Sequence, residues 1–216
     1  MTSKLLTEAI GTFVLVLTIG LARVQEGVPS PLAVGVALMA VVYAGGHISG
    51  AHYNPAVTIA IWIRGAIPTR EVVPYIVAQS LGALVAAFFV YKFNGFPLHI
   101  EPGEGVSAWK AVTGEAIMTF VLAWVILNVA FTKGTAGNDY FGIAIGGTVM
   151  GGAFALGDIT GAAFNPAVGL MTAIFEPLVG YDPSPMAWIY AIGPVLGGLG
   201  AAVVYKASQP AEAQSA

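Results

Sequence analysis

A twelve-residue segment occurs twice in this chain, and the duplication constrains the fold more than any other feature. Residues 46–57 read GHISGAHYNPAV and residues 157–168 read GDITGAAFNPAV, so eight of the twelve positions are identical. A second matching pair lies upstream, EAIGTFVL starting at Glu8 and EAIMTFVL starting at Glu115. Because both pairs occur in the same order, we predict an internal duplication, with repeat 1 at about residues 4–92 and repeat 2 at about residues 109–206.

Each repeat contains three apolar stretches that approach the length of a membrane span. A hydrocarbon core about 30 Å thick needs roughly 20 mostly apolar residues per helix. The strands of a membrane barrel alternate apolar and polar residues, and these stretches show no such alternation. The predicted spans are Leu5–Ala22, Pro31–Gly46, Val72–Tyr91, Ala111–Phe131, Tyr140–Leu156 and Met186–Tyr205. The predicted fold class is an all-α membrane protein whose residues 1–216 form one domain, with residues 207–216 as a disordered tail.

Composition indicates the same environment and excludes several kinds of function. Charged residues make up 9% of the chain, against about 25% in a soluble domain, so a lipid bilayer is the expected solvent. The eight Lys and Arg are scattered, which excludes a nucleic-acid-binding face. The sequence has no cysteine, only three separated histidines, no nucleophile–base pair and no phosphate loop, so we expect no metal site, no cofactor and no enzymatic activity.

An odd number of spans in each repeat makes the two repeats enter the membrane from opposite sides. Inverted repeats of this kind place a transport site near the midplane, where discontinuous helices from the two halves meet. Counted on the loops, five basic residues against three favour both termini in the cytoplasm. The expected location is the plasma (inner) membrane.

The segment after each Asn-Pro-Ala is too short to span. Val57–Ile63 and Val168–Phe175 predict helices of about 10 residues, roughly 15 Å long, which is half a bilayer. Asparagine is a favoured helix N-cap and proline a favoured first helical residue. We therefore predict two re-entrant half-helices that meet N-terminus to N-terminus, starting at Asn54, Pro55 and Ala56 and at Asn165, Pro166 and Ala167.

This geometry predicts a chemistry for the meeting point. Each helix N-terminus carries roughly +0.5 charge, so the pair repels cations. If the asparagine oxygens cap their own helices, the amide groups of Asn54 and Asn165 remain free to donate into a lumen. The extended segments before the caps would offer backbone carbonyls as acceptors, from Ala51, His52, Tyr53, Gly161 and Ala163. Such a polar stripe suits a small neutral permeant that forms hydrogen bonds.

The duplicated Asn-Pro-Ala segments and the paired Glu-Ala-Ile-x-Thr-Phe segments resemble the aquaporins of the major intrinsic protein family over about residues 4–206. The resemblance implies six transmembrane helices with two re-entrant half-helices, assembled as a homotetramer with one pore per subunit. It also implies a passive channel in which pore diameter, lining groups and half-helix dipoles set selectivity.

The sequence departs from the water-selective members at the narrow filter. Those members carry an arginine directly after the second Asn-Pro-Ala, and here that residue is Val168. Family spacing places the other three filter positions at Val34, Ala153 and Ala162. This small, apolar and uncharged set predicts a wide aperture that passes water, urea, glycerol, ammonia or metalloid hydroxides such as arsenous acid, while ions stay excluded.

Two carboxylates inside spans allow other interpretations. An ionisable residue in a span is functional by default, but the matching positions of Glu8 and Glu115 favour a structural role, in which they accept hydrogen bonds from the backbone of the re-entrant loops. The ring of His52 is expected to brace its loop. The alternatives that stay open are a water-selective channel, a closed-pore structural membrane protein and a secondary transporter, for which Glu8 and Glu115 are the available coupling charges.

Overall fold

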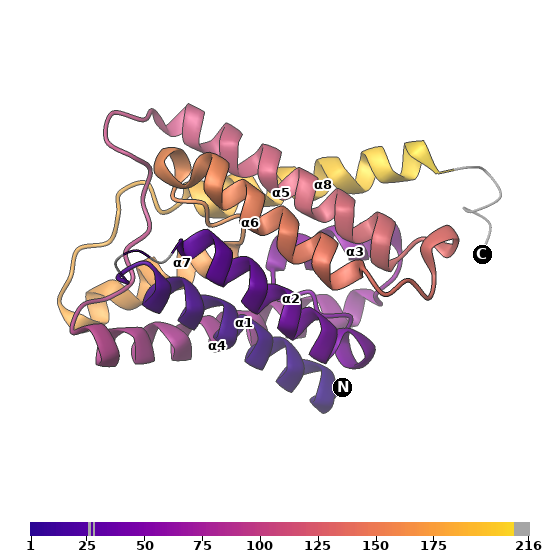
Figure 1. Cartoon of the computed structure of the whole chain (residues 1–216), viewed down its shortest axis with the longest axis horizontal. Coiled ribbons are helices and arrows are strands. Elements are labelled where there is room, and N and C mark those ends of the chain that lie inside the picture. The colour runs from indigo at the N-terminus through magenta and orange to yellow at the C-terminus, as the bar shows by residue number, and fades with distance from the viewer. Residues whose placement is uncertain (26, 28, 210–216) are drawn as a thin grey trace.

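The computed structural model describes residues 1–25, 27 and 29–209 as a bundle of helices (Figure 1). Six helices are long and apolar enough to cross a membrane. They are α1 (Thr2–Ala22), α2 (Ser30–Ser49), α4 (Thr69–Asn94), α5 (Ala108–Ala130), α6 (Phe141–Thr160) and α8 (Ile189–Ser208). The described residues contain no strand, so the predicted all-α membrane fold is confirmed.

Several helices extend beyond the apolar runs that predicted them. Glycines end α2, α4 and α6 at Gly50, Gly95 and Gly161, with φ values of 88°, 79° and 83°. Glycine adopts this left-handed conformation without steric cost and so terminates helices. Hydropathy locates only the apolar part of a helix, whereas the capping glycine sets its end. Of the predicted tail, Ala207 and Ser208 still belong to α8, and residues 210–216 lie outside the described residues.

Two short helices follow the two Asn-Pro-Ala motifs. Helices α3 (Pro55–Arg64) and α7 (Pro166–Phe175) have ten residues each, which is about 15 Å, or half of a hydrocarbon core. Each begins with proline and is preceded by an extended asparagine whose side chain accepts a hydrogen bond from the backbone. The predicted pair of half-helices is therefore confirmed. The turns η1 (Lys133–Thr135) and η2 (Glu176–Val179) complete the described elements.

The two repeats pack in matching ways. Helix α1 packs on α4 and α5 packs on α8, while α2 contacts α6 across the two repeats. Each half-helix contacts a long helix of the other repeat, α3 against α8 and α7 against α4. Helix α8 ends at the end of the bundle where α1 begins (Figure 1), as expected for an even number of spans.

Glycines at equivalent positions permit the close helix crossings. A side chain at Gly82 would collide with the carbonyl oxygen of Ala9, and one at Gly197 would collide with that of Ala116. These pairs bring α1 against α4 and α5 against α8, so the same contact occurs once in each repeat. Small residues let membrane helices approach until their backbones touch.

Candidate functional site

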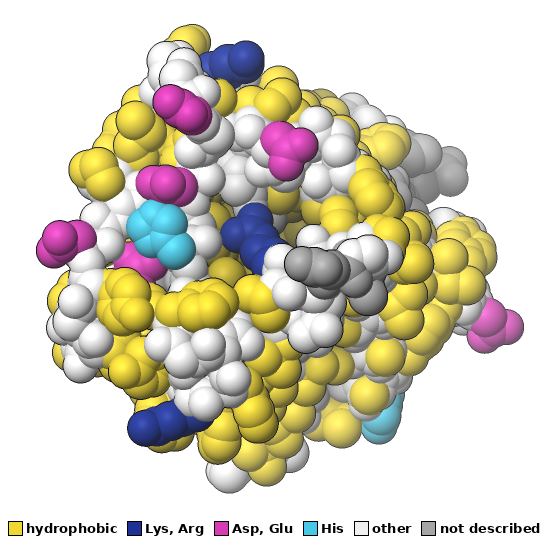
Figure 2. All heavy atoms as spheres, turned by 60° about the vertical axis from the view of Figure 1, so that its left-hand side comes forward, with side chains coloured by type: hydrophobic (Ala, Val, Ile, Leu, Met, Phe, Trp, Pro, Cys, Tyr) yellow, Lys and Arg dark blue, Asp and Glu magenta, His cyan; other side chains and the backbone are white. Residues whose placement is uncertain are grey.

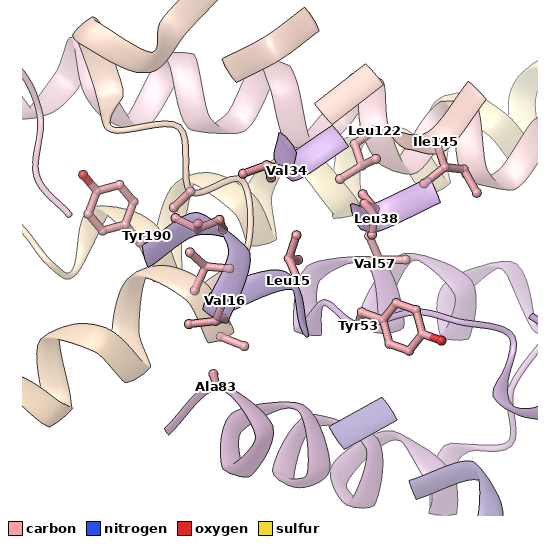
Figure 3. Close-up of a cluster of buried hydrophobic side chains, with 14 of the residues drawn as sticks. Leu15, Val16, Val34, Leu38, Tyr53, Val57, Ala83, Leu122, Ile145 and Tyr190 are labelled. Atoms are coloured by element: carbon pink, nitrogen blue, oxygen red, sulfur yellow. The ribbon is translucent and has the colours of Figure 1, made fainter. Parts of the chain in front are cut away.

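A cavity of about 470 Å³ lies between the repeats and reaches the ends of both half-helices. Its walls are mostly apolar, and Figure 3 shows side chains of α1, α2, α5 and α6 converging there. The lining comprises Leu15, Ile19, Arg23, Ser30, Pro31, Val34, Leu38, Val42, Ala51, His52, Tyr53, Asn54, Val57, Leu122, Ile126, Ile145, Val149, Ala153, Phe154, Gly157, Asp158, Ala162, Ala163, Phe164 and Asn165. Mostly apolar walls with a limited number of polar groups suit a small neutral molecule.

The two asparagines join the half-helices to each other. Asn54 Oδ1 accepts from the N–H of Ala56 at 2.9 Å, and Asn165 Oδ1 accepts from the N–H of Ala167 at 2.9 Å. Each amide group also donates across the midplane, from Asn54 to the carbonyl of Phe164 and from Asn165 to the carbonyl of Tyr53, both at 2.8 Å. One of the two amide hydrogens is thus already used, and each asparagine keeps a single N–H for the cavity.

An unusual backbone conformation precedes each half-helix. Ala51 and Tyr53 in the first loop, and Ala162 and Phe164 in the second, have φ values between 49° and 51°. Non-glycine residues adopt this left-handed region rarely, and it persists only where surrounding contacts hold it. The contacts that hold the two loops come from Glu8 and Glu115.

Glu8 accepts four hydrogen bonds inside the bundle. Its Oε1 accepts from the hydroxyl of Ser49 at 2.6 Å and from the N–H of His52 at 3.0 Å, and its Oε2 accepts from the N–H of Tyr53 at 2.7 Å and the amide of Gln79 at 2.8 Å. The side chain is fully buried. The carboxylate therefore fixes the backbone of the first loop.

Glu115 holds the second loop in the same way. Its Oε1 accepts from the hydroxyl of Thr160 at 2.7 Å and the N–H of Ala163 at 3.2 Å, and its Oε2 accepts from the N–H of Phe164 at 2.6 Å. Tyr190 adds a hydrogen bond from its hydroxyl to the carbonyl of Thr160 at 2.7 Å. Tyr75 makes the equivalent bond to Ser49 in the first repeat, at 2.9 Å.

The first loop is surrounded by polar side chains from the loop itself, α3 and α4 that have no counterpart around the second loop. Gln79 donates to the hydroxyl of Thr58 at 2.9 Å as well as to Glu8, and the Nδ1 of His52 lies 3.1 Å from the same hydroxyl. At the equivalent positions the second repeat has Pro194, Gly169 and Ala163. The ring of His52 is buried and takes part in this network, while His52 also contributes to the cavity wall.

Three of the four predicted filter residues line the cavity, namely Val34, Ala153 and Ala162. The fourth, Val168, does not belong to the lining and is only 1% exposed. Of the residues expected to present carbonyls, Ala51, His52, Tyr53 and Ala163 line the cavity. Gly161 is absent from the lining, and Phe164 is a lining residue that the sequence analysis did not include.

Arg23 also lines the cavity, directly after the end of α1, and is not among the residues predicted from the sequence. Its Nη2 donates to the carbonyl of Gly161 at 2.7 Å, and its Nη1 donates to the carbonyl of His99 at 3.4 Å. Figure 2, which looks at this end of the bundle, shows a basic side chain in the central hollow with histidine and acidic side chains beside it. No local sequence signal marks this position, because its partners are 76 and 138 residues away.

Comparisons with known proteins agree with this architecture. The chain is 39% identical over 188 residues to aquaporin AqpM of Methanothermobacter thermautotrophicus, a match that covers 81% of this chain and 74% of the relative. It is 36% identical over 216 residues to nodulin-26 of Glycine max, covering 94% of this chain and 76% of the relative. The fold superimposes on the X-ray structure of the aquaglyceroporin from Plasmodium falciparum with a TM-score of 0.81 and 22% identity, covering 95% of this chain and 94% of that one.

A family model described as "Major intrinsic protein" matches residues 1–205, which is nearly the whole chain. With two Asn-Pro half-helices joined at their N-termini inside a six-span bundle, the chain belongs to the major intrinsic protein family of membrane channels, the aquaporins.

Proposed function

We propose that this channel passes water together with small neutral solutes of the size of urea, glycerol, ammonia or metalloid hydroxides such as arsenous acid. The observation that carries the proposal is the lining around the cavity, where Val34, Ala153 and Ala162 present only small apolar side chains. None of these three side chains donates a hydrogen bond, so they do not select for water.

Ions are excluded at the meeting point of the half-helices. The N-termini of α3 and α7 direct their positive ends toward the midplane, and the remaining N–H groups of Asn54 and Asn165 orient an oxygen atom of the permeant. A cation that enters loses its hydration and meets the positive dipole ends of both half-helices at this level. A neutral solute meets donors and apolar walls.

The contacts of the two buried carboxylates argue against the transporter alternative. Glu8 accepts four hydrogen bonds and Glu115 accepts three, and neither residue lines the cavity. A coupling group must exchange protons or ions with the permeation path. We therefore assign both residues to the support of the loops.

The proposal includes an assembly and an orientation. The channel forms a homotetramer with one pore in each subunit, lies in the plasma (inner) membrane, and has both termini in the cytoplasm. The basic residues of the loops support this orientation. Native mass spectrometry of the purified channel tests the tetramer, and protease accessibility in oriented vesicles tests the orientation.

Stopped-flow light scattering on proteoliposomes tests the solute range. We expect the parent chain to pass water, urea and glycerol, and the variants Ala153→Phe and Val34→Phe to reduce the glycerol flux by about tenfold, an effect of about 1.4 kcal/mol on the barrier, while water flux persists. Leu6→Phe, at an exposed position of α1 outside the cavity lining, is the matched control and leaves all fluxes unchanged. A parent that passes only water supports the water-selective alternative, and a parent that passes nothing supports the closed-pore one.

A further inference from the structure

The cavity mouth carries one guanidinium, and it comes from the end of α1. The residue after the second Asn-Pro-Ala is Val168, whose side chain is buried and does not reach the cavity. Arg23 occupies the mouth instead, anchored at 2.7 Å to the carbonyl of Gly161, which directly precedes the lining residue Ala162. The guanidinium of Arg23 therefore lies beside the second re-entrant loop, although Arg23 is not part of that loop.

The charge of Arg23 is not neutralised by a bonded carboxylate. Both of its hydrogen bonds go to backbone carbonyls, and within the described part of the chain it forms no ion pair. Glu115 interacts with Arg23 through its charge but accepts its hydrogen bonds from Thr160, Ala163 and Phe164. Two other acids are paired with His99, which lies 2.6 Å from Glu176 and 3.2 Å from Glu101. Asp158 lines the same cavity and is the acidic side chain that faces it.

A guanidinium held this way still has donors to offer. Arginine has five N–H groups in a rigid fork, and Arg23 uses two of them to bind Gly161 and His99. The remaining three have no hydrogen-bond partner among the described residues. The shorter bond, to the carbonyl of Gly161, holds the guanidinium beside the cavity.

We propose that Arg23 is a specificity-determining residue of this pore, which supplies from α1 the positive charge and the N–H donors that water-selective relatives place after the second Asn-Pro-Ala. This inference rests on the proposed channel function. Arg23 repels cations at the mouth before they reach the half-helix ends, and it binds the hydroxyl or carbonyl oxygen of neutral solutes. The small apolar side chains of Val34, Ala153 and Ala162 in the cavity lining leave room for these solutes.

The test compares cation leak and solute flux in proteoliposomes made from the parent and from charge variants. Arg23→Gln removes the charge, so we expect the K⁺ and proton leak to rise on the order of tenfold, while water flux persists. Lys92→Gln is the matched control, because it removes the same charge from the end of α4 at a residue outside the cavity lining. Its leak is expected to equal that of the parent.

One further variant separates a charge role from a role in holding the loop. In Arg23→His the charge is switched by pH, so the leak should be low below about pH 6 and high above about pH 7, whereas the arginine of the parent keeps its charge over this range. This difference between the two pH profiles does not follow if Arg23 only fixes the carbonyl of Gly161.

The outcomes are distinguishable. A parent that passes no solute overturns the proposed function and this inference with it. A conducting parent whose Arg23→Gln and Arg23→His variants exclude cations as well as it does, at every pH, overturns the role of Arg23 alone. If Arg23→Gln does not yield folded protein, the pH profile of Arg23→His decides the question.

Discussion

The side-chain amide of Asn54 donates to the backbone carbonyl of Phe164 at 2.8 Å, and so the cap of one half-helix is bonded to the loop of the other. Asn165 returns the bond to Tyr53 at the same distance. Each asparagine therefore has two tasks, because its oxygen begins one half-helix while its nitrogen ties the two repeats together. Two reciprocal hydrogen bonds at the midplane therefore close a ring that links the repeats, so the position of each half-helix depends on the other.

Replacing the asparagines by aspartate tests this ring, because aspartate can still cap a helix but cannot donate across the midplane. The carbonyl of Phe164 also accepts from the hydroxyl of Thr119 at 3.3 Å, whereas that of Tyr53 depends on Asn165. We expect the free energy of unfolding of both variants to fall by about 1–3 kcal/mol. The loss should be larger for Asn165→Asp than for Asn54→Asp. Thermal unfolding in detergent, followed by tryptophan fluorescence, measures the order. Equal losses would contradict the part assigned to Thr119.

Local features of the sequence were sufficient to predict the frame of this fold. The recurrence of Asn-Pro-Ala gave the duplication, and the short apolar segments after it predicted α3 and α7, because helix capping depends on neighbouring residues. The exact ends of α2 and α6 were missed by up to four residues, since Gly50 and Gly161 end the helices beyond the apolar run.

The mouth of the pore could not be predicted in the same way. Arg23 reaches Gly161 only because the repeats are interleaved, and neither residue has a local pattern that indicates the contact. Family spacing assigns Val168 to the filter, and its short side chain is buried and outside the cavity lining, which spacing along the sequence does not predict. The hydrogen bonds from each asparagine to the opposite loop likewise could not be predicted, because they depend on how the two repeats pack against each other.

The two buried carboxylates should differ in their importance for stability. Glu8 accepts four hydrogen bonds and Glu115 accepts three. In Glu8→Gln and Glu115→Gln an amide donor faces backbone N–H groups, and leaving such a group unpaired costs about 1–3 kcal/mol. We expect both variants to unfold at lower temperature, with the larger loss for Glu8→Gln. The exposed Glu104→Gln is the control and should be neutral. A proton-coupled flux that either variant abolished, with stability unchanged, would instead favour a transporter.

Gly82 should tolerate no side chain, because a β-carbon there would collide with the carbonyl oxygen of Ala9. We expect Gly82→Ala to force α1 and α4 apart and to cost about 1–3 kcal/mol. Gly147→Ala is a matched control inside α6, where a β-carbon meets no atom within 4 Å. In that variant the higher helix propensity of alanine should leave stability unchanged or raise it by about 0.5–1 kcal/mol. Similar unfolding temperatures for both variants would show that the close crossing is not required.

The loop that carries His99, at the mouth of the cavity, should lose stability as the pH rises. Burial lowers the pKa of His99, but its hydrogen bonds and charge interactions with Glu176 and Glu101 outweigh burial, so this pKa lies above the ordinary value of 6.5. Burial raises the pKa of Glu176 above 4.5, against the opposing effect of His99. The folded state therefore binds more protons than the unfolded state at both sites, and stability falls with increasing pH.

For His99 the stabilisation is complete below pH 6.5 and disappears as the pH rises through its raised pKa. The backbone carbonyl of His99 accepts a hydrogen bond from Arg23. When His99 loses its charge and its attraction to Glu176 and Glu101, the anchor of the Arg23 guanidinium therefore loosens as well. We expect the unfolding temperature of the parent to fall between about pH 6 and about pH 9 by more than that of His99→Gln, which cannot titrate. His47→Gln is the control, since His47 lies near the far end of α2, and it should follow the parent. Parallel pH curves for the parent and His99→Gln would show that His99 does not act as a charged partner of Glu176 and Glu101.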